Sequence, residues 1–361
     1  MKQILFLIFL TFFSVSAYCQ QPPSRALFVS VIQEPPVLES RQDIASLIAF
    51  AAQAHITMLF VQVYHSGQSW FPSRIVDDSW YKTCRKSVGE DPLALLIKEA
   101  HAQGIQVHAW LNVMSLGGNK NAYFLKRYGT QILTQNLNPK TKLEDYKIDN
   151  QYFLEPGDPR VRNDLARVVA ELTNRYPDLD GVQFDYIRYP DVHPHYGYTK
   201  INMERFKQVT GFKTIDEAST DWQDWRRNQV TEVLTTLVNT IQARHPKMQI
   251  STTGCMPYAR AMYEAYQDWP LWISEGLTDF VTIMDYSTDP VQFKKWIDVI
   301  KEKTGDDFAK VRIAVGAEKL VHDPATFETE FEICEQIKGM CTVFHYGNLL
   351  ENPELEKFLK K

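Results

Sequence analysis

The hydrophobic positions of this chain alternate between a strand-like and a helix-like pattern. Short apolar runs rich in β-branched and aromatic residues predict strands at 26–32, 57–63, 105–112, 181–185, 248–253, 279–285, 311–317 and 341–346. Stretches with a period near 3.6 predict helices at 40–54, 91–103, 159–175, 222–245, 264–275, 290–302, 325–338 and 353–360. Asp-Pro pairs lie at or beside the start of three of these helices, and they combine a capping residue with the residue that suits the first helical position.

Eight strands, each followed by a helix, indicate an α/β protein built as a (β/α)8 TIM barrel. An open doubly wound sheet is the alternative, but it rarely uses eight such units, and no GxGxxG motif follows the first strand. No linker rich in Gly, Ser or Pro interrupts the pattern. We therefore expect a single barrel domain over residues 25–361.

The connections that leave a predicted strand are longer than those that enter one. The long connections cover 64–90, 113–157 and 186–221. In a TIM barrel the loops that leave strands form the catalytic face, so we expect these three segments to lie on that face. The 113–157 segment is long enough to form a lid or a substrate wall.

Residues 1–17 have the pattern of a secretory signal peptide. Lys2 precedes an apolar run over 4–13, which is too short to span a bilayer, and Ala17 ends a small-residue cleavage site. Cys19 raises the alternative of a lipid anchor, but the bulky Tyr18 before it does not suit such a signal. We expect a periplasmic or extracellular protein, free or associated with the envelope, with no transmembrane segment in the mature chain.

The composition narrows the range of partners. The chain has 361 residues, with 39 Lys and Arg against 44 Asp and Glu, so a net charge of −5 without a basic block argues against nucleic acid. Aromatic residues form 12% of the chain, and aromatic faces in loops suit sugar rings. No Cys or His spacing is typical of structural zinc, so we expect no metal and no cofactor. We expect the cysteines after the signal to be buried thiols, with a Cys334–Cys341 disulfide as the alternative.

Polar side chains recur where the predicted strands end. In 105–112 the apolar residues share one face, which leaves His108, Trp110 and Asn112 on the inward face of the barrel. The same alternation in the two neighbouring strands places four more side chains on the inward face, namely Gln62, Tyr64, Gln183 and Asp185.

Several acidic residues are expected to converge on the same mouth. Asp285 ends the sixth strand, Glu318 follows the seventh and Glu34 lies beyond the first, while His345 and Tyr346 end the eighth. Such a group suits glycosidic cleavage, in which one carboxyl group protonates the leaving oxygen and a second carboxylate meets the oxocarbenium-like charge. Metal-dependent hydrolysis is disfavoured because no HExxH motif occurs and the histidines are scattered.

The segment Leu179–Pro190, with the sequence LDGVQFDYIRYP, resembles the fourth strand of the glycoside hydrolase-like 10 family. The segments HAWLN at 108–112 and IMDY at 283–286 resemble its third and sixth strands. The resemblance implies an exported (β/α)8 barrel that acts on amino-sugar polymers. Some members cleave peptidoglycan glycan strands that lack stem peptides, and related domains cleave partly deacetylated poly-N-acetylglucosamine.

A more distant similarity to chitinase-like barrels breaks down at one position. Those barrels carry DGxDxDxE on the fourth strand, and the final Glu is the general acid. This chain has Gln183, Asp185 and Ile187 at the three acidic positions. The chitinase acid is therefore absent, and Asp185 or a carboxylate from another strand must replace it.

These observations predict a glycoside hydrolase that acts on a polysaccharide or glycan strand of the cell envelope. Asp185 is the expected general acid/base, with Asp285 as its partner, Glu318 as the alternative partner, or a substrate acetamido group as an internal nucleophile. The expected substrate-binding residues are Tyr64, His108, Trp110, Asn112, Gln183, Tyr186, Arg188, Tyr286, His345 and Tyr346. Arg188 offers a fork of donors for hydroxyl, carboxylate or acetamide oxygens. The alternative function is a catalytically weak carbohydrate-binding barrel, and a deacetylase is disfavoured without paired metal ligands.

Overall fold

The structure is a computed structural model that describes residues 25–192, 194–337 and 341–360. The expected signal peptide and Cys19 lie outside the described residues. No described helix combines the length and the apolar character that crossing a bilayer would require.

Eight parallel strands close into a barrel, as the sequence predicts. Each strand pairs with the next in chain order, and β1 closes the ring by pairing with both β2 and β9. The barrel strands are β1 (Arg25–Val29), β2 (Ile56–His65), β4 (Gln106–Asn112), β5 (Gly181–Asp185), β6 (Gln249–Cys255), β7 (Phe280–Asp285), β8 (Val311–Gly316) and β9 (Cys341–Phe344). The two-residue β3 (Gln68–Ser69) adds only a short antiparallel extension to β2.

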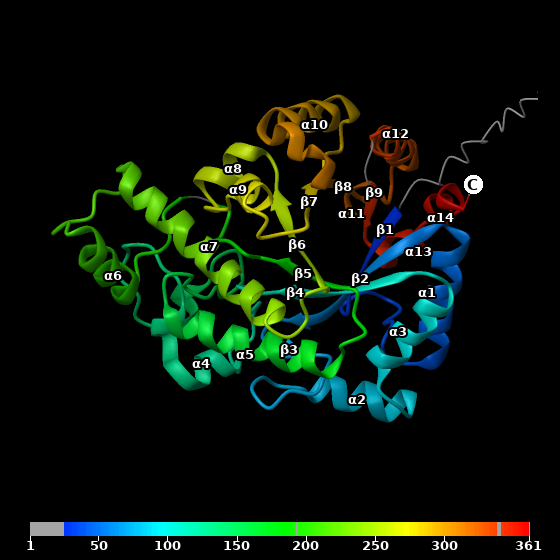
Figure 1. The fold of residues 1–361 in the computed structure, drawn as a ribbon, viewed down its shortest axis with the longest axis horizontal. Helices are drawn as coiled ribbons and strands as arrows, with labels where there is room; N and C mark the ends of the chain where they lie inside the picture. Colours follow the sequence, from blue (N-terminus) through cyan, green and yellow to red (C-terminus); the bar gives the residue numbers. More distant parts are fainter. Residues whose placement is uncertain (1–24, 193, 338–340, 361) are drawn as a thin grey trace, which may run out of the picture.

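One long or medium helix follows each barrel strand and covers its outer face (Figure 1). These helices are α1 (Arg41–Gln53), α3 (Pro92–Ala102), α5 (Pro159–Arg175), α7 (Thr220–Gln242), α9 (Trp269–Ser274), α10 (Pro290–Thr304), α12 (Pro324–Glu335) and α14 (Pro353–Leu359). The Asp residues of all three Asp-Pro pairs cap their helices, because each side chain accepts a hydrogen bond from a backbone N–H of the first turn.

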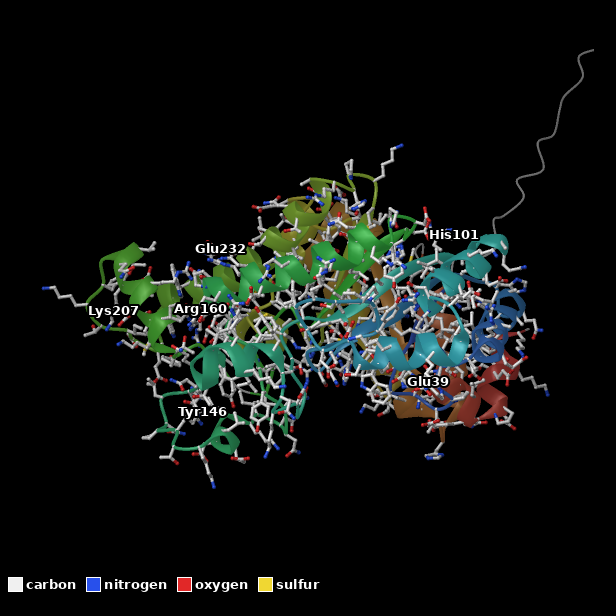
Figure 2. All side chains as sticks on the ribbon, turned by 90° about the horizontal axis from the view of Figure 1, so that it is seen from below. Glu39, His101, Tyr146, Arg160, Lys207 and Glu232 are labelled. Atoms are coloured by element: carbon white, nitrogen blue, oxygen red, sulfur yellow. A yellow bond between two sulfur atoms is a disulfide. The ribbon has the colours of Figure 1, made fainter. Side chains whose placement is uncertain are left out.

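The long connections contain helical structure that the hydrophobic pattern did not reveal. They carry α2 (Ser79–Val88), α4 (Tyr123–Tyr128), η1 (Gly129–Ile132), η2 (Leu143–Tyr146) and α6 (Lys200–Thr210). Shorter elements after the later strands are α8 (Tyr258–Tyr263), η3 (Gly305–Lys310), α11 (Ala317–Leu320) and α13 (Tyr346–Glu351). In Figure 1, α4 and α6 lie at the opposite end of the long axis from α14. Figure 2 likewise places Tyr146 and Lys207 far from Glu39 and His101.

The inside of the barrel is filled by aromatic side chains. Phe28, Phe60 and Phe280 are buried there together with Trp110. The Phe28 ring lies 4.7 Å from Phe60 and 5.0 Å from Trp110, between centroids. Alternate residues of the same strands enter the larger core between the barrel and the helices. The interior is therefore a packed plug, and open space exists only above it.

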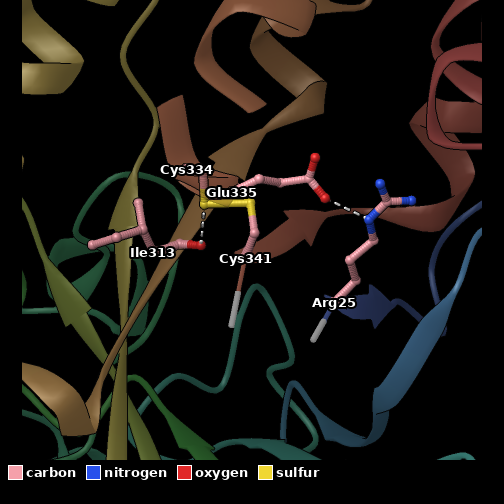
Figure 3. The surroundings of a disulfide bond; sticks show 5 residues. All are labelled: Arg25, Ile313, Cys334, Glu335 and Cys341. Carbon is pink, nitrogen blue, oxygen red and sulfur yellow. Dashed lines mark hydrogen bonds and ion pairs between the residues drawn. A yellow bond between two sulfur atoms is a disulfide. The ribbon is translucent and has the colours of Figure 1, made fainter. Parts of the chain in front are cut away.

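The structure corrects the expectation for two cysteines. Cys334, at the end of α12, and Cys341, at the start of β9, form a disulfide with their Cα atoms 5.5 Å apart (Figure 3). Cys84 and Cys255 are free and buried, as expected. Sequence spacing alone gave no sign that the chain turns back between residues 334 and 341. Beside the disulfide, Arg25 Nε donates to Glu335 Oε1 at 2.7 Å and so ties the start of β1 to α12.

Removing this disulfide should destabilise the fold. The loop it closes is short, so the chain-entropy relation gives about 2 kcal/mol for the loss in free energy of unfolding on Cys334→Ser/Cys341→Ser substitution. Denaturant titration of the double variant against the parent checks the magnitude. As a control, alkylation of the denatured parent without reductant should label Cys19, Cys84 and Cys255 but neither Cys334 nor Cys341. Labelling of Cys334 and Cys341 would contradict the pairing.

Candidate active site

A pocket of about 650 Å³ opens at the carboxyl ends of the barrel strands. This volume is in the range of small-molecule sites. Nine of the residues singled out from the sequence line it, namely Gln62, Trp110, Asn112, Asp185, Tyr186, Arg188, Tyr286, Glu318 and His345. The 113–157 segment contributes no lining residue, so it forms neither a lid nor a wall of this pocket.

The carboxylate of Asp185 is held by three hydrogen bonds at the end of β5. Its Oδ1 accepts from the Thr253 hydroxyl at 2.6 Å and from the Tyr186 backbone N–H at 2.7 Å. Its Oδ2 accepts from Trp110 Nε1 at 3.3 Å. Two donors occupy the lone pairs of Oδ1, whereas Oδ2 retains one lone pair that is free to carry a proton.

Trp110 belongs both to the barrel core and to the pocket wall. Its indole packs on Phe28 and on Phe344, with centroids 5.0 and 6.0 Å apart, and it is 3% exposed. Its N–H nevertheless reaches Asp185, and the residue lines the pocket. The aromatic plug therefore orients a donor to the candidate catalytic carboxylate.

Tyr186 and Arg188 lie where the chain leaves β5. Tyr186 has a φ of 57°, in the left-handed region that a bulky residue adopts only when its surroundings require it. The Arg188 guanidinium lies 4.3 Å from the centroid of the Tyr186 ring. Its Nη1 lies 3.9 Å from Asp185 Oδ1, so the cation adds charge near the carboxylate without a direct hydrogen bond.

The opposite wall comes from the ends of the later strands. Tyr286 follows β7 and stacks on Phe344, with centroids 5.2 Å apart. Burial, together with the carboxylates of Asp185 and Glu318, raises the pKa of Tyr286 well above its ordinary value. The phenol is therefore a neutral donor within electrostatic reach of both carboxylates. A Cβ at Gly316 would lie 3.0 Å from the Tyr286 side chain, so this glycine lets the tyrosine pack closely.

Two half-buried histidines, His65 and His345, line the pocket. The Nδ1 of His345 accepts from the Gly347 backbone N–H at 3.2 Å, which places the ring proton on Nε2. The Nδ1 of His65 lies 3.4 Å from the amide nitrogens of Gln62 and Asn112 and accepts in the same way. Burial lowers the pKa of both rings, so both are neutral.

His65 takes the place that the sequence assigned to Tyr64. The pairing of β2 with β4 shifts between Gln62 and Tyr64, and this bulge turns Tyr64 to the outer face, opposite Leu111. Tyr64 is buried in the core between barrel and helices and does not line the pocket. The expectation for Tyr64 was wrong because strict alternation does not survive a bulge.

His108 and Gln183 do point inward, but they lie below the pocket. His108 is fully buried against Phe60 and Phe280, with centroids 5.6 and 5.9 Å apart, and burial together with Arg312 lowers its pKa to about 3. Gln183 is buried and accepts a hydrogen bond from Ser251. Each of the two lies two residues before the pocket-lining residue of its strand, Trp110 or Asp185, so it cannot reach a substrate.

The expected partner Asp285 lies outside the barrel. In β7, Met284 lines the pocket, so the next residue, Asp285, faces the helices and is fully buried near Glu330 of α12. Tyr346 is also outside the pocket, packed on Phe50 at 5.1 Å between centroids, and Glu34 is exposed and absent from the lining. Of the two partners expected for Asp185, Glu318 on α11 is therefore the one that lines the pocket.

Sequence reasoning missed several lining residues. They come from helices or from loop positions beyond the strand ends, and they include Asp191, Arg260, Trp296 and Lys319. Trp296 lies on α10 and Arg260 on α8, within helical patterns that carry no sign of a site. Across the described ranges, no three His, Cys, Asp or Glu side chains are grouped to bind a metal ion. The site thus combines three carboxylates, neutral donors, cations and aromatic faces.

Comparison with known sequences identifies a family. The model of the family described as "Glycosyl hydrolase-like 10" matches residues 25–333. The chain is 26% identical to glycosyl hydrolase DigH of Escherichia coli K12, over 77% of this chain and 66% of that protein. It is also 26% identical to glycosyl hydrolase YngK of Bacillus subtilis, over 69% of this chain and 50% of that protein. The chain therefore spans less than two thirds of the length of these relatives.

Solved structures agree on the fold. An α-L-fucosidase isoenzyme from Paenibacillus thiaminolyticus superposes with a TM-score of 0.59 at 14% identity, over 94% of this chain and 48% of the other. A β-galactosidase from Marinomonas superposes with a TM-score of 0.60 at 10% identity, over 93% and 58%. At these identities the likeness concerns the barrel alone.

The buried position of Asp285 outside the barrel leads to a prediction about how the free energy of unfolding depends on pH. Burial, reinforced by Glu330, raises the pKa of Asp285 to about 8, and burial with Asp289 and Asp323 raises that of Glu330 to about 8. An unfolded chain releases these protons near pH 4. Between about pH 4 and 8 the folded chain holds more protons, so its free energy of unfolding should fall as pH rises.

Denaturant titrations at pH 5 and pH 8 check this expectation. Asp285→Asn should reduce the loss of stability between the two pH values by at least about 1 kcal/mol. Asp298→Asn, an exposed position on α10, is the matched control and should leave the loss unchanged. An unaltered loss in Asp285→Asn would contradict the raised pKa.

Proposed function

The chain belongs to the glycosyl hydrolase-like 10 family, and from this membership we propose that it is an exported glycoside hydrolase that cleaves an amino-sugar polysaccharide of the cell envelope. The observation that carries the proposal is the joint presence of Asp185 and Glu318 in one pocket at the carboxyl ends of the strands. The E. coli and B. subtilis relatives, both described as glycosyl hydrolases, support the reaction class.

In the proposed reaction Asp185 is the general acid/base. Its Oδ2 carries the proton, because Oδ1 already accepts from Thr253 and Tyr186. As the glycosidic bond breaks, this proton passes to the leaving oxygen and leaves Asp185 as the carboxylate. A water molecule then forms the new bond to the anomeric carbon, and the Asp185 carboxylate takes the proton that this water loses. The three donors around the carboxylate stabilise the charge that then forms.

Glu318 is the proposed second carboxylate. It lines the pocket from α11, and Tyr286 lies within electrostatic reach of both Glu318 and Asp185. Its negative charge meets the oxocarbenium-like ring as the bond breaks. A substrate acetamido group acting as an internal nucleophile is the variant of this mechanism, and Tyr286 or a neutral histidine Nε2–H then donates to its oxygen.

The pocket chemistry supports an amino sugar as substrate. Tyr286, Phe344 and Trp296 supply aromatic surface for sugar rings, and the two neutral histidines supply donors for hydroxyl and acetamide oxygens. Glycan strands of peptidoglycan and poly-N-acetylglucosamine both carry these groups. The resemblance of the 179–190 segment to the glycoside hydrolase-like 10 family points to the same substrates.

Two features support export. Residues 1–17 have the composition of a signal peptide. The Cys334–Cys341 disulfide is the kind of bond that persists in the periplasm or outside the cell and is rare in the cytosol.

Asp185→Asn should lower the rate of glycan cleavage by about a hundredfold or more, because the amide cannot donate the proton. Release of new reducing ends from purified glycan strands measures the effect. Glu318→Gln should also lower the rate strongly. Asp285 ends a barrel strand as Asp185 does, but it lies outside the pocket. Asp285→Asn is therefore the matched control and should keep the parental rate at pH 6. If Asp185→Asn keeps that rate, Asp185 has only a structural role. If the parent binds glycan without releasing reducing ends, and Asp185→Asn binds it equally well, the carbohydrate-binding alternative gains support.

Export can be tested by deletion. The full chain, expressed in a Gram-negative host, should be processed after Ala17 and recovered from the periplasm or medium. A chain that begins at residue 18 should stay in the cytoplasm. Fractionation with N-terminal mass spectrometry measures both, and recovery of an unprocessed full chain in the cytoplasm would contradict the proposal.

A further inference from the structure

Two arginines lie together at the side of the pocket formed by β5 and β6. Arg188 follows β5 and is 6% exposed, while Arg260 lies on α8 after β6 with its side chain 41% exposed. Both line the pocket and both approach one carboxylate, Asp191. Arg188 Nε lies 3.8 Å from Asp191 Oδ1, and Arg260 Nη2 lies 3.4 Å from Asp191 Oδ2.

These guanidinium groups have more donors than the surrounding protein satisfies. Within the described residues, Arg188 Nε, Arg188 Nη1 and Arg260 Nε have no hydrogen-bond partner. A buried charged donor without a partner is costly, so such donors normally meet an acceptor. Asp191 is too distant from Arg188 for a hydrogen bond and is shared between two cations.

The other acids of the pocket are already engaged. Asp185 accepts from Thr253, Tyr186 and Trp110, and Glu318 lies 3.1 Å from the ammonium group of Lys319. Arg188 Nη1 lies 3.9 Å from Asp185 Oδ1, and Asp191 is shared between Arg188 and Arg260, so neither carboxylate accepts a hydrogen bond from the unpartnered donors of these guanidinium groups. A neutral sugar would offer these donors no charged acceptor.

We propose that Arg188 and Arg260 form a subsite for a carboxylate carried by the sugar bound next to Asp185. This inference rests on the proposed function and deepens it, because it assigns an acidic sugar to the substrate. A guanidinium fork binds the two oxygens of a carboxylate side by side, a match that hydroxyl groups do not provide. Arg188 is fixed by its packing on the Tyr186 ring, and the more exposed Arg260 closes on the carboxylate from the rim.

Two kinds of acidic sugar carry the required group. A muramic acid residue without peptide has a free lactyl carboxylate, and a uronic acid has its carboxylate on the ring. In both, conversion of the carboxylate to an alcohol removes the charge and keeps the sugar ring. This conversion provides a direct test.

Binding is measured by titration calorimetry in a Glu318→Gln background, so that the result does not depend on cleavage. The probes are a peptide-free tetrasaccharide of N-acetylglucosamine and N-acetylmuramic acid, a tetrasaccharide of N-acetylglucosamine and glucuronic acid, their carboxyl-reduced forms, and neutral N-acetylglucosamine tetrasaccharide. At least one acidic probe should bind about tenfold or more tightly than its reduced form. The probe that shows the preference identifies the kind of sugar.

The preference is the ratio of the affinities for the acidic probe and its reduced form. Arg260→Gln and Arg188→Gln should each lower this ratio to about one. Lys303→Gln removes one positive charge from an exposed position of α10 outside the pocket lining and should preserve it. If Arg188→Gln does not fold, Arg260→Gln alone decides, because this side chain is partly exposed. The inference would be overturned if the parent bound the acidic and the reduced probe equally well, or if the arginine variants kept the parental ratio of affinities. In either case, cleavage of a neutral glycan would still support the proposed function. Failure to bind any probe would overturn both.

Discussion

The site depends on the way the closed barrel places donors around one carboxylate. Asp185 pairs in register with Asn112 of β4, and its neighbour Phe184 pairs with Thr252 of β6, so Thr253 lies beside the carboxylate. Donors from the strands on both sides, together with the Tyr186 backbone N–H, then reach it. A shift of one residue in either pairing would turn these donors toward the helices. The sheet register therefore determines the geometry on which any chemistry in the pocket depends.

The architecture was predictable because it follows from a regular period. All eight strands and the helix after each of them were expected from hydrophobic spacing, with boundaries that differ by a few residues. Helices α2, α4 and α6 were missed because they lie within long connections, where the pattern is weaker and the chain is positioned by packing. The Cys334–Cys341 disulfide was only the alternative expectation, because the approach of the end of α12 to the start of β9 is a tertiary feature.

The site was predictable only where alternation held to the end of a strand. Trp110, Asn112 and Asp185 line the pocket as expected. In β2, however, a bulge places His65 in the pocket instead of Tyr64. In β7, Met284 faces the pocket, so Asp285 faces the helices. Arg260 and Trp296 lie on helices, where a strand-based argument cannot find them. The motif around 179–190 also divides into two parts. Asp180 accepts a hydrogen bond from the backbone N–H of Val107, and a Cβ at Gly181 would lie 2.4 Å from the His108 ring. The first part of the motif therefore maintains the barrel, and only the second part forms the site.

The aromatic plug has a consequence for how a polymer can be handled. Phe28, Phe60, Trp110 and Phe280 fill the barrel beneath the pocket, so the pocket has a closed floor. A long chain therefore cannot thread through the barrel. It must lie across the mouth or insert one terminus, and both products must leave on the side from which the chain arrived.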